Sequence, residues 1–405
     1  MTLPSTPHSP SDRLHALDNL RAVMMWLGIV LHVAMIYTVQ PMPAQWHDTQ
    51  TSMGADAVLG IIHAFRMPTF FILAGFFVAL LVERRGLVAM LKNRLLRLGA
   101  PFALLWPPLI FAMSLCIMMF VHRMVRGTWG MDPTIVPVIP GHPKINTMHL
   151  WFIWMLMWFS VATFALAPLG QKVSQQWRQK LGGAFVWVAS STVGLAALAL
   201  PLAVLGLGYR GGFLTDSGAF MPPLTEWLHN GLFYAFGLAL YHQRDTLLAH
   251  YQRRWLLYGA LGWVFIGISG VVVKMDHDQP GSIAHFEFFS GLVYNLCTWF
   301  WSVGVIGLFA RHMRRSSPVL QYLSHASYWV YLIHMPITIL FGALLFGEPL
   351  SVFSKIAINI TATTLIALLS YHFLVRSTPL GTLLTGKRYP FTLPGLRPVS
   401  AAVAT

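Results

Sequence analysis

Ten long apolar stretches constrain this chain more than any other feature of its sequence. About 20 consecutive apolar residues are enough to cross the hydrocarbon core of a bilayer as a helix. Only 10% of the residues are charged, against about a quarter in a water-soluble protein. The sequence therefore predicts an all-α integral membrane protein, a bundle of about ten transmembrane helices. The predicted spans are 19–39, 56–82, 98–121, 148–169, 182–206, 225–242, 255–273, 285–308, 320–346 and 352–375.

The rest of the sequence leaves little room for a second domain. Residues 1–18 are polar and lack the pattern of a cleavable signal peptide, so they predict a short N-terminal segment. Residues 19–375 predict a single transmembrane domain, and residues 376–405 predict a C-terminal tail. Continuous apolar runs exclude a transmembrane β-barrel, because its strands alternate apolar and polar residues.

Lysine and arginine are distributed unevenly between the two sides of the predicted bundle. Of the 27 Lys and Arg residues, 19 fall on the side that holds both termini and five on the other. Loops that remain in the cytoplasm collect these residues. Both termini are therefore predicted to be cytoplasmic. The net charge of +14 is then an orientation signal, and no nucleic-acid partner is expected.

The first predicted span begins beside Asp18 and contains Arg21 and His32. Ionisable groups inside a bilayer are costly unless they are paired or face a wet cavity, so they are functional candidates. Arg21 and His32 are eleven residues apart, which places them on one helix face about 16 Å apart. Asp18 lies three residues before Arg21 and is positioned to pair with it. The alternative is that Arg21 reaches the cytoplasmic interface and His32 hydrogen-bonds a neighbouring helix.

Other spans hold polar side chains near mid-membrane or toward the ends that face away from the basic loops. His63 and Arg66 are three residues apart, as are Tyr331 and His334, so each pair is expected to share one helix face. Any one of these histidines is more often a structural hydrogen-bonding group, and Arg66 has the alternative of an interhelical ion pair. An interfacial aromatic belt accounts equally well for Trp151. Their number, on several different helices, predicts a shared polar cavity. The residues concerned are His63, Arg66, His149, Trp151, Glu287, Tyr331 and His334.

Arg94 and Arg97 form a basic pair on the predicted cytoplasmic side, just before the third span. They are one helical turn apart and are expected to face the same way. Two such arginines suit a phosphate or diphosphate through bidentate contacts. The alternative is that they set the topology or touch anionic lipid.

Several catalytic schemes have no support in the sequence. There is no G-x-S-x-G elbow, no P-loop and no H-E-x-x-H motif. Without a thiolate cluster or a dense set of carboxylates, no metal site is expected. A histidine general base fits the pH at which such a protein works.

The helix-one residues and the arginine pair resemble the acyltransferase type 3 family of membrane acyltransferases. In that family an Arg or Lys precedes a His by eleven positions. Here Arg21, which follows the residues Leu-Asp-Asn-Leu, precedes His32 by the same spacing. Arg94-Leu-Leu-Arg97 resembles the Arg-x-x-Arg motif at the third helix of the family.

Three further segments carry the same resemblance along nearly the whole chain. Phe70-Phe-Ile-Leu-Ala-Gly75 resembles the Phe-Phe-x-x-Ser-Gly segment, with an alanine in place of the serine. His149-Leu-Trp-Phe and Tyr331-Leu-Ile-His also match the family.

The resemblance implies a multi-pass enzyme of the bacterial inner membrane with no permanently bound cofactor. Acyl-CoA would be the co-substrate, with its phosphates held by Arg94 and Arg97 from the cytoplasm. His32 would be the catalytic general base, and Asp18 and Arg21 would organise the entrance. The acyl group or the acceptor would be bound by His63, Arg66, His149, Trp151, Glu287, Tyr331 and His334.

Within the family, the stretches around His32, Arg66 and His334 resemble most the enzymes that succinylate osmoregulated periplasmic glucans. This implies succinyl-CoA as the donor and a periplasmic glucan as the acceptor, with Arg66 holding the free carboxylate through two hydrogen bonds. Direct transfer and an acyl-histidine intermediate both stay open. Membrane lipid is expected to surround the protein. Assembly with further copies of the chain, or with the glucan-synthesis machinery, also stays open.

Two other functions are compatible with the same residues. An O-acetyltransferase for lipopolysaccharide or another exported polysaccharide would share His32 and the arginine pair, and would differ in the mass added to its product. A transporter or flippase for an anionic metabolite would use Arg66 and the histidines as a relay and would cleave no thioester. No internal repeat between the two halves supports the transporter.

Overall fold

The structure, a computed structural model, describes residues 10–39, 46–138, 143, 145–314, 317–386 and 388–391. Within these residues the chain is built from helices without a strand, as the sequence predicts. The helices are α1 (Pro10–Ala34), α2 (Met53–Arg85), α3 (Leu87–Arg94), α4 (Ala100–Arg126), α5 (Trp151–Gln171), α6 (Gln175–Ser190), α7 (Thr192–Ala197), α8 (Ala199–Gly206), α9 (Leu224–His242), α10 (Arg244–Asp278), α11 (Phe286–His312), α12 (Pro318–Leu345), α13 (Val352–Ser370) and α14 (Pro379–Thr385).

The number of clear membrane-spanning helices is smaller than the ten predicted. In the described part of the chain, eight helices are long and apolar enough to span a bilayer, or nine if α6 and the α7–α8 pair form one bent span. The sixth predicted span, 225–242, forms α9 but is not among them. The polar residues of α9 point into the protein, since Glu226 and Asn230 are only 2% and 4% exposed. The polar side chains Glu226 and Asn230 of α9 therefore lie in the interior of the bundle.

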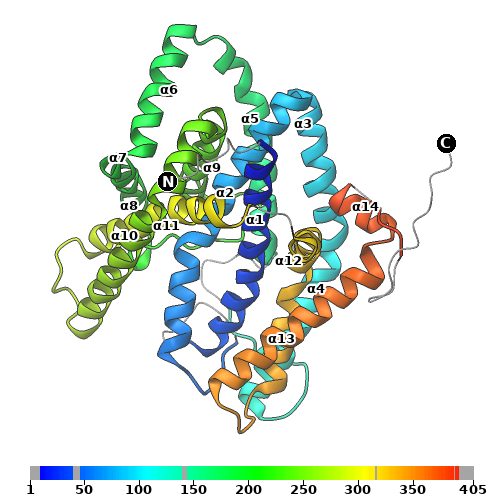
Figure 1. Cartoon of the computed structure of the whole chain (residues 1–405). Helices are drawn as coiled ribbons and strands as arrows, with labels where there is room; N and C mark the ends of the chain where they lie inside the picture. Colours follow the sequence, from blue (N-terminus) through cyan, green and yellow to red (C-terminus); the bar gives the residue numbers. More distant parts are fainter. Residues whose placement is uncertain are drawn as a thin grey trace, which may run out of the picture.

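The fifth predicted span, 182–206, is not one continuous helix. α6 ends at Ser190, and the chain bends by 92° before it continues as α7 and α8 (Figure 1). Ser191 is extended, with ψ 143°, and its Oγ accepts a hydrogen bond from Gly194 N at 2.9 Å, which caps α7. A Cβ at Gly194 would meet the backbone of Val188, so the bend requires glycine there.

Two glycines bring α2 and α9 into close contact. A Cβ at Gly75 of α2 would meet Tyr234 O, and a Cβ at Gly237 of α9 would meet Ile72 O. Small residues at a crossing let helix backbones approach closely inside a membrane. This packing holds the polar first turns of α9 beside α2.

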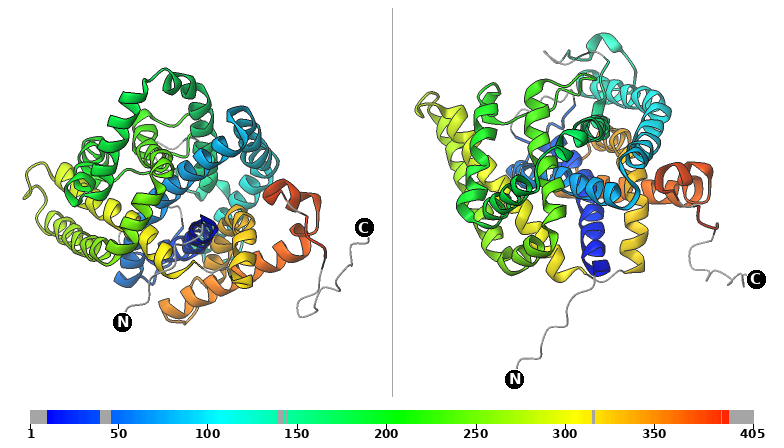
Figure 2. Two further views of the ribbon diagram at one scale, coloured as in Figure 1. Left: turned by 45° about the horizontal axis from the view of Figure 1, so that its top comes forward. Right: turned by 90° about the horizontal axis from the view of Figure 1, so that it is seen from above.

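α1 runs between two groups of helices. Figures 1 and 2 show α10 and α11 on one side of it and α4, α12 and α13 on the other. The first half of α1 contributes Leu20 and Met24 to an apolar cluster shared with α2, α9 and α11. Its second half contributes Ile29 and Val33 to a cluster shared with α4 and α12. The last turn of α1, which carries His32, therefore lies where the two groups meet.

A fully buried ion pair ties α13 to the segment after α1. Lys355 Nζ donates to Asp48 Oδ2 at 2.9 Å, and both side chains are 0% exposed. Asp48 also accepts a hydrogen bond from Gln50 N at 2.9 Å. Removing one member of such a pair leaves the other charge buried and uncompensated.

We expect the Lys355→Met substitution to lower the free energy of unfolding by about 3–5 kcal/mol, because Asp48 then stays buried without its cation. The measurement is thermal unfolding of the purified protein in detergent. Adding Asp48→Asn removes the stranded charge and should restore most of the loss. A double variant that loses the sum of the two single effects would show that the pair contributes no coupling.

Candidate functional site

Seven of the predicted site residues line one cavity of about 170 Å³ between α1, α2, α5 and α12. On α2 and on α12, the two predicted residues that are three positions apart both line this cavity. Apolar side chains, Phe70 and Phe152 among them, make up much of the remaining wall. The seven are His32, His63, Arg66, His149, Trp151, Tyr331 and His334.

Three histidine rings cluster in this cavity. The ring centroids of His32 and His334 are 5.2 Å apart, and those of His149 and His334 are 5.4 Å apart. They come from α1, α12 and the short helical turn Met148–Leu150 that precedes α5. Helices far apart in the sequence thus assemble the cluster.

Backbone carbonyls fix two of the three rings. His149 Nε2 donates to Leu332 O at 2.9 Å, and His334 Nδ1 donates to Tyr331 O at 2.7 Å. The opposite nitrogens, Nδ1 of His149 and Nε2 of His334, are buried without a hydrogen-bond partner. A neutral imidazole that donates through one nitrogen presents a lone pair at the other. The Nδ1 of His32 is buried and unpartnered as well.

Arg66 reaches this cavity without a direct ion pair to a described residue, although the Asp216 carboxylate lines the same cavity and attracts it at longer range. No carboxylate of the described residues lies within ion-pair distance of it, and its Nε is buried without a hydrogen bond. The guanidinium lies against Gly28 of α1, where a Cβ would meet its Nη1 atom. The expected alternative, an interhelical ion pair, is therefore not formed. An unpaired cation in a bundle is costly, so its position favours binding of an anionic ligand group.

Asp216 lines the cavity although sequence reasoning missed it. It stands in the loop between α8 and α9, where helical spacing gives no signal. The loop is held in place because Gly218 O accepts hydrogen bonds from both N and Oγ1 of Thr147, at 2.7 and 2.9 Å. Ser217 N also donates to Glu226 Oε1 at 2.8 Å.

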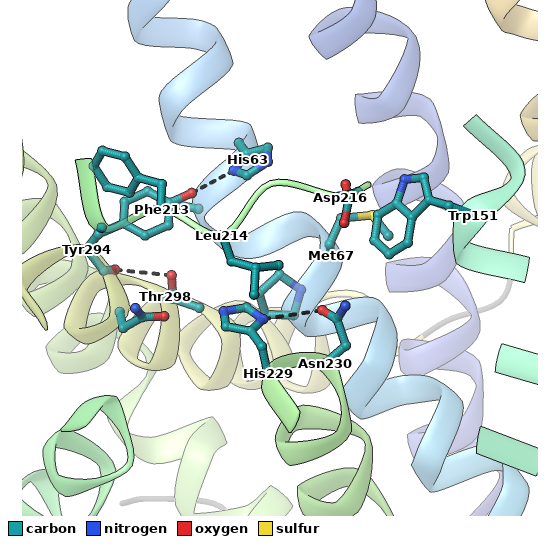
Figure 3. Close-up of a pocket in the computed structure, with 14 residues that line it drawn as sticks. His63, Met67, Trp151, Phe213, Leu214, Asp216, His229, Asn230, Tyr294 and Thr298 are labelled. Carbon is teal, nitrogen blue, oxygen red and sulfur yellow. Dashed lines mark hydrogen bonds between the residues drawn. The ribbon is translucent and has the colours of Figure 1, made fainter. Parts of the chain in front are cut away.

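A second, smaller cavity of about 40 Å³ adjoins the first between α2, α9 and α11 (Figure 3). His63, Met67, Trp151 and Asp216 line both cavities and lie between them. His63 Nδ1 hydrogen-bonds Tyr294 Oη at 2.7 Å across this boundary. His229, Asn230, Asn295 and Thr298 line only the smaller cavity. None of these four was predicted as a site residue.

Asp18 and Arg21 lie away from both cavities, nearer the start of α1. They form the expected ion pair, with Arg21 Nη2 3.2 Å from Asp18 Oδ1. Both side chains are about two-fifths exposed, at 41% and 42%. Arg21 also lies over the ring of Phe77 on α2.

The sequence predicts that Arg94 and Arg97 face the same way. In the structure they do not. A π-helical turn, Leu95–Gly99, replaces regular α-helix immediately after Arg94. Its wider turn rotates the two side chains apart. The Nε of Arg94 is buried without a hydrogen bond. Arg97 lies against the end of α14, where a Cβ at Gly386 would meet its guanidinium.

Glu287 is placed outside both cavities. It is an exposed residue in the first turn of α11. Its backbone oxygen packs against Gly212. The structure therefore does not bring this side chain to the residues with which the sequence had grouped it.

The histidine cluster does not have the form of a metal site. In the described part of the chain, no group of three or more His, Cys, Asp and Glu side chains is arranged to hold a metal ion. Two of the three rings already donate to backbone carbonyls through one nitrogen. The unpartnered ring nitrogens of the cluster are available for hydrogen bonds to a ligand.

The sequence of this chain is similar to known proteins along most of its length. The glucans biosynthesis protein C of Salmonella schwarzengrund and that of Salmonella typhimurium are each 25% identical over 397 residues, which cover 93% of this chain and 96% of each relative. The protein of that name from Salmonella paratyphi B is 24% identical over the same shares. No solved structure matches the sequence. The family profile described as acyltransferase domain matches residues 14–372, and the chain therefore belongs to this acyltransferase family.

Proposed function

We propose that this protein is a membrane-embedded O-acyltransferase that moves a succinyl group from succinyl-CoA to hydroxyls of osmoregulated periplasmic glucans. The observation that carries the proposal is Arg66, a cation without a direct ion pair among the described residues, in the same cavity as three histidines with unused ring nitrogens. A succinyl group ends in a carboxylate that a guanidinium can hold through two hydrogen bonds. The relatives named for glucan biosynthesis support the choice of acceptor.

In this mechanism His32 is the general base. Its neutral ring takes the proton from the acceptor hydroxyl while the hydroxyl oxygen attacks the thioester carbon. The ester C–O bond forms, the thioester C–S bond breaks, and the proton on His32 passes to the leaving CoA sulfur. The His334 ring, 5.2 Å away and fixed by Tyr331 O, limits where the His32 ring can lie.

The donor approaches from the side of the arginine pair. Arg94 and Arg97 bind separate CoA phosphates there, since their side chains do not face the same way, and Asp18 and Arg21 organise the path into the bundle. Eleven helical residues between Arg21 and His32 correspond to about 16 Å, a distance that the pantetheine arm spans. The excess of basic residues on that side supports placing it, with both termini, in the cytoplasm of a cell whose inner membrane holds the protein.

The acceptor approaches from the opposite side. The cavity lies at the end of α1 and near the start of α5, toward the loops with few basic residues. His63 and Trp151 stand where the two cavities meet and would contact the sugar. His149 and Tyr331 hold the wall behind it, since Tyr331 Oη donates to His149 O at 2.6 Å.

The decisive assay uses purified protein, succinyl-CoA and a glucan oligosaccharide. We expect free CoA to appear together with an oligosaccharide heavier by one succinyl group, as read by mass spectrometry. Acetyl transfer under the same conditions would instead indicate an acetyltransferase. Movement of an anionic metabolite in proteoliposomes without thioester cleavage would overturn the proposal in favour of a transporter.

Substituting Gly28 with alanine tests the position of Arg66 without touching a polar group. The new methyl would meet Arg66 Nη1, the flexible end of a side chain, so the guanidinium must shift while the helices stay packed. We expect about a tenfold fall in kcat/KM for succinyl-CoA, since the arginine loses its alignment with the carboxylate. Gly60→Ala is the matched control, because nothing lies within 4 Å of a Cβ there. Equal activity of both variants would contradict the assignment of Arg66.

A further inference from the structure

The smaller cavity contains two buried amide groups with unused hydrogen-bonding atoms. Asn230 of α9 and Asn295 of α11 are 4% and 3% exposed, and both line the cavity. Asn230 Oδ1 accepts a hydrogen bond from His229 Nδ1 at 3.3 Å, while its Nδ2 has no partner. Asn295 Nδ2 donates to Gly291 O at 2.8 Å, while its Oδ1 lies near the His229 ring without a hydrogen bond of good geometry.

These two atoms have opposite hydrogen-bonding character. Asn230 Nδ2 is a donor and Asn295 Oδ1 is an acceptor. A hydroxyl group can pair with either atom, because its oxygen accepts a bond from Asn230 Nδ2 and its hydrogen can be donated to Asn295 Oδ1. A carboxylate has no hydrogen to give to Asn295 Oδ1, so the pair discriminates against the acid end of a succinyl group. Buried polar atoms of this kind are costly while they stay unpaired.

The size of the cavity limits what can enter it. A volume of about 40 Å³ accommodates a few atoms, since about 10–15 Å³ by such a measure holds one water molecule. A whole sugar ring does not fit, whereas one hydroxyl or hydroxymethyl group does. The larger cavity next to it, of about 170 Å³, has room for the rest of the ring beside His32.

We propose that the smaller cavity is a binding subsite for one hydroxyl-bearing group of the acceptor sugar, held between Asn230 and Asn295. This inference rests on the proposed function for the identity of the acceptor. The hydroxyl that is acylated lies in the larger cavity, and a second hydroxyl of the same sugar or its neighbour enters the smaller one. Asn230 and Asn295 thereby position the acceptor and take no part in bond making.

The test measures equilibrium binding of a glucan oligosaccharide and, separately, of succinyl-CoA to purified protein. Asn230→Leu and Asn295→Leu each remove the polar atoms of the amide while keeping the branched shape and the number of side-chain heavy atoms. We expect each to raise the Kd for the oligosaccharide about fivefold to tenfold and to leave the Kd for succinyl-CoA unchanged. If Asn230→Leu does not fold, Asn230→Ser replaces it, because serine removes the amide nitrogen and keeps a small polar group.

Ser302→Ala is the matched control, since Ser302 lies on α11, is 0% exposed, and has an unpartnered Oγ outside both cavities. Its Kd for the oligosaccharide should match that of the unaltered protein. An unchanged oligosaccharide Kd in both asparagine variants overturns the subsite. Failure of the proposed function is seen separately, as binding of the oligosaccharide by the unaltered protein without any transfer from succinyl-CoA.

Discussion

Replacing His32 with alanine should reduce acyl transfer more than a hundredfold while the protein stays folded. A positioned general base contributes about 10²–10⁴ to a rate, and the alanine cannot take the proton from the acceptor hydroxyl. The ring lies at the junction of the two helix groups and makes no hydrogen bond to a described residue in this structure. Its loss should therefore cost little stability. The rate is measured as succinyl groups added to a glucan oligosaccharide, by mass spectrometry.

His122→Ala is the matched control for His32→Ala. His122 is near the end of α4 and hydrogen-bonds Thr128 O at 2.8 Å, away from both cavities. It should transfer at the rate of the unaltered protein. If His32→Ala kept full activity while His334→Ala lost it, the base would be His334, whose ring is already fixed with a free Nε2.

Arg66→Gln should change the choice of donor rather than the chemistry. Hydrogen bonds to a charged group contribute about 1.5–3 kcal/mol, so kcat/KM for succinyl-CoA should fall about 10- to 100-fold. Transfer from acetyl-CoA, which has no carboxylate, should change much less. Arg66 makes no direct ion pair, so glutamine breaks none. The thermal stability should be largely retained, since Asp216 in the same cavity loses only a longer-range attraction.

Arg123→Gln is the comparison for Arg66→Gln. Arg123 of α4 pairs with Glu348 at 3.3 Å and lines neither cavity. We expect this variant to keep the preference between the two donors. An equal loss for succinyl-CoA and acetyl-CoA in Arg66→Gln would contradict a role for the guanidinium in binding the succinyl carboxylate.

The all-helical fold class could be predicted from the sequence, because an apolar run of about twenty residues has few stable forms other than a membrane-spanning helix. The bend at Ser191 could not be predicted, since an apolar run looks the same whether its helix is straight or broken. For α9, the sequence predicts a membrane span, but Glu226 and Asn230 lower the apolar character of the helix. Both side chains are buried against neighbouring helices.

The site was predictable where two residues share one helix. The three-residue spacing of Tyr331 and His334 correctly implied one face, because both lie on regular helix. Arg94 and Arg97, also three residues apart, do not share one face as predicted, because a π-helical turn changes the angle per residue. Asp216 had no such signal, since hydrogen bonds from distant residues position its loop.

The most direct test of the account is an experimental structure with a succinyl-CoA analogue in which a methylene replaces the thioester sulfur. We expect the CoA phosphates on the side of Arg94 and Arg97, the carbonyl carbon in the larger cavity beside His32, and the carboxylate on Arg66. CoA bound from the opposite side of the bundle, or a carbonyl carbon outside that cavity, would contradict it.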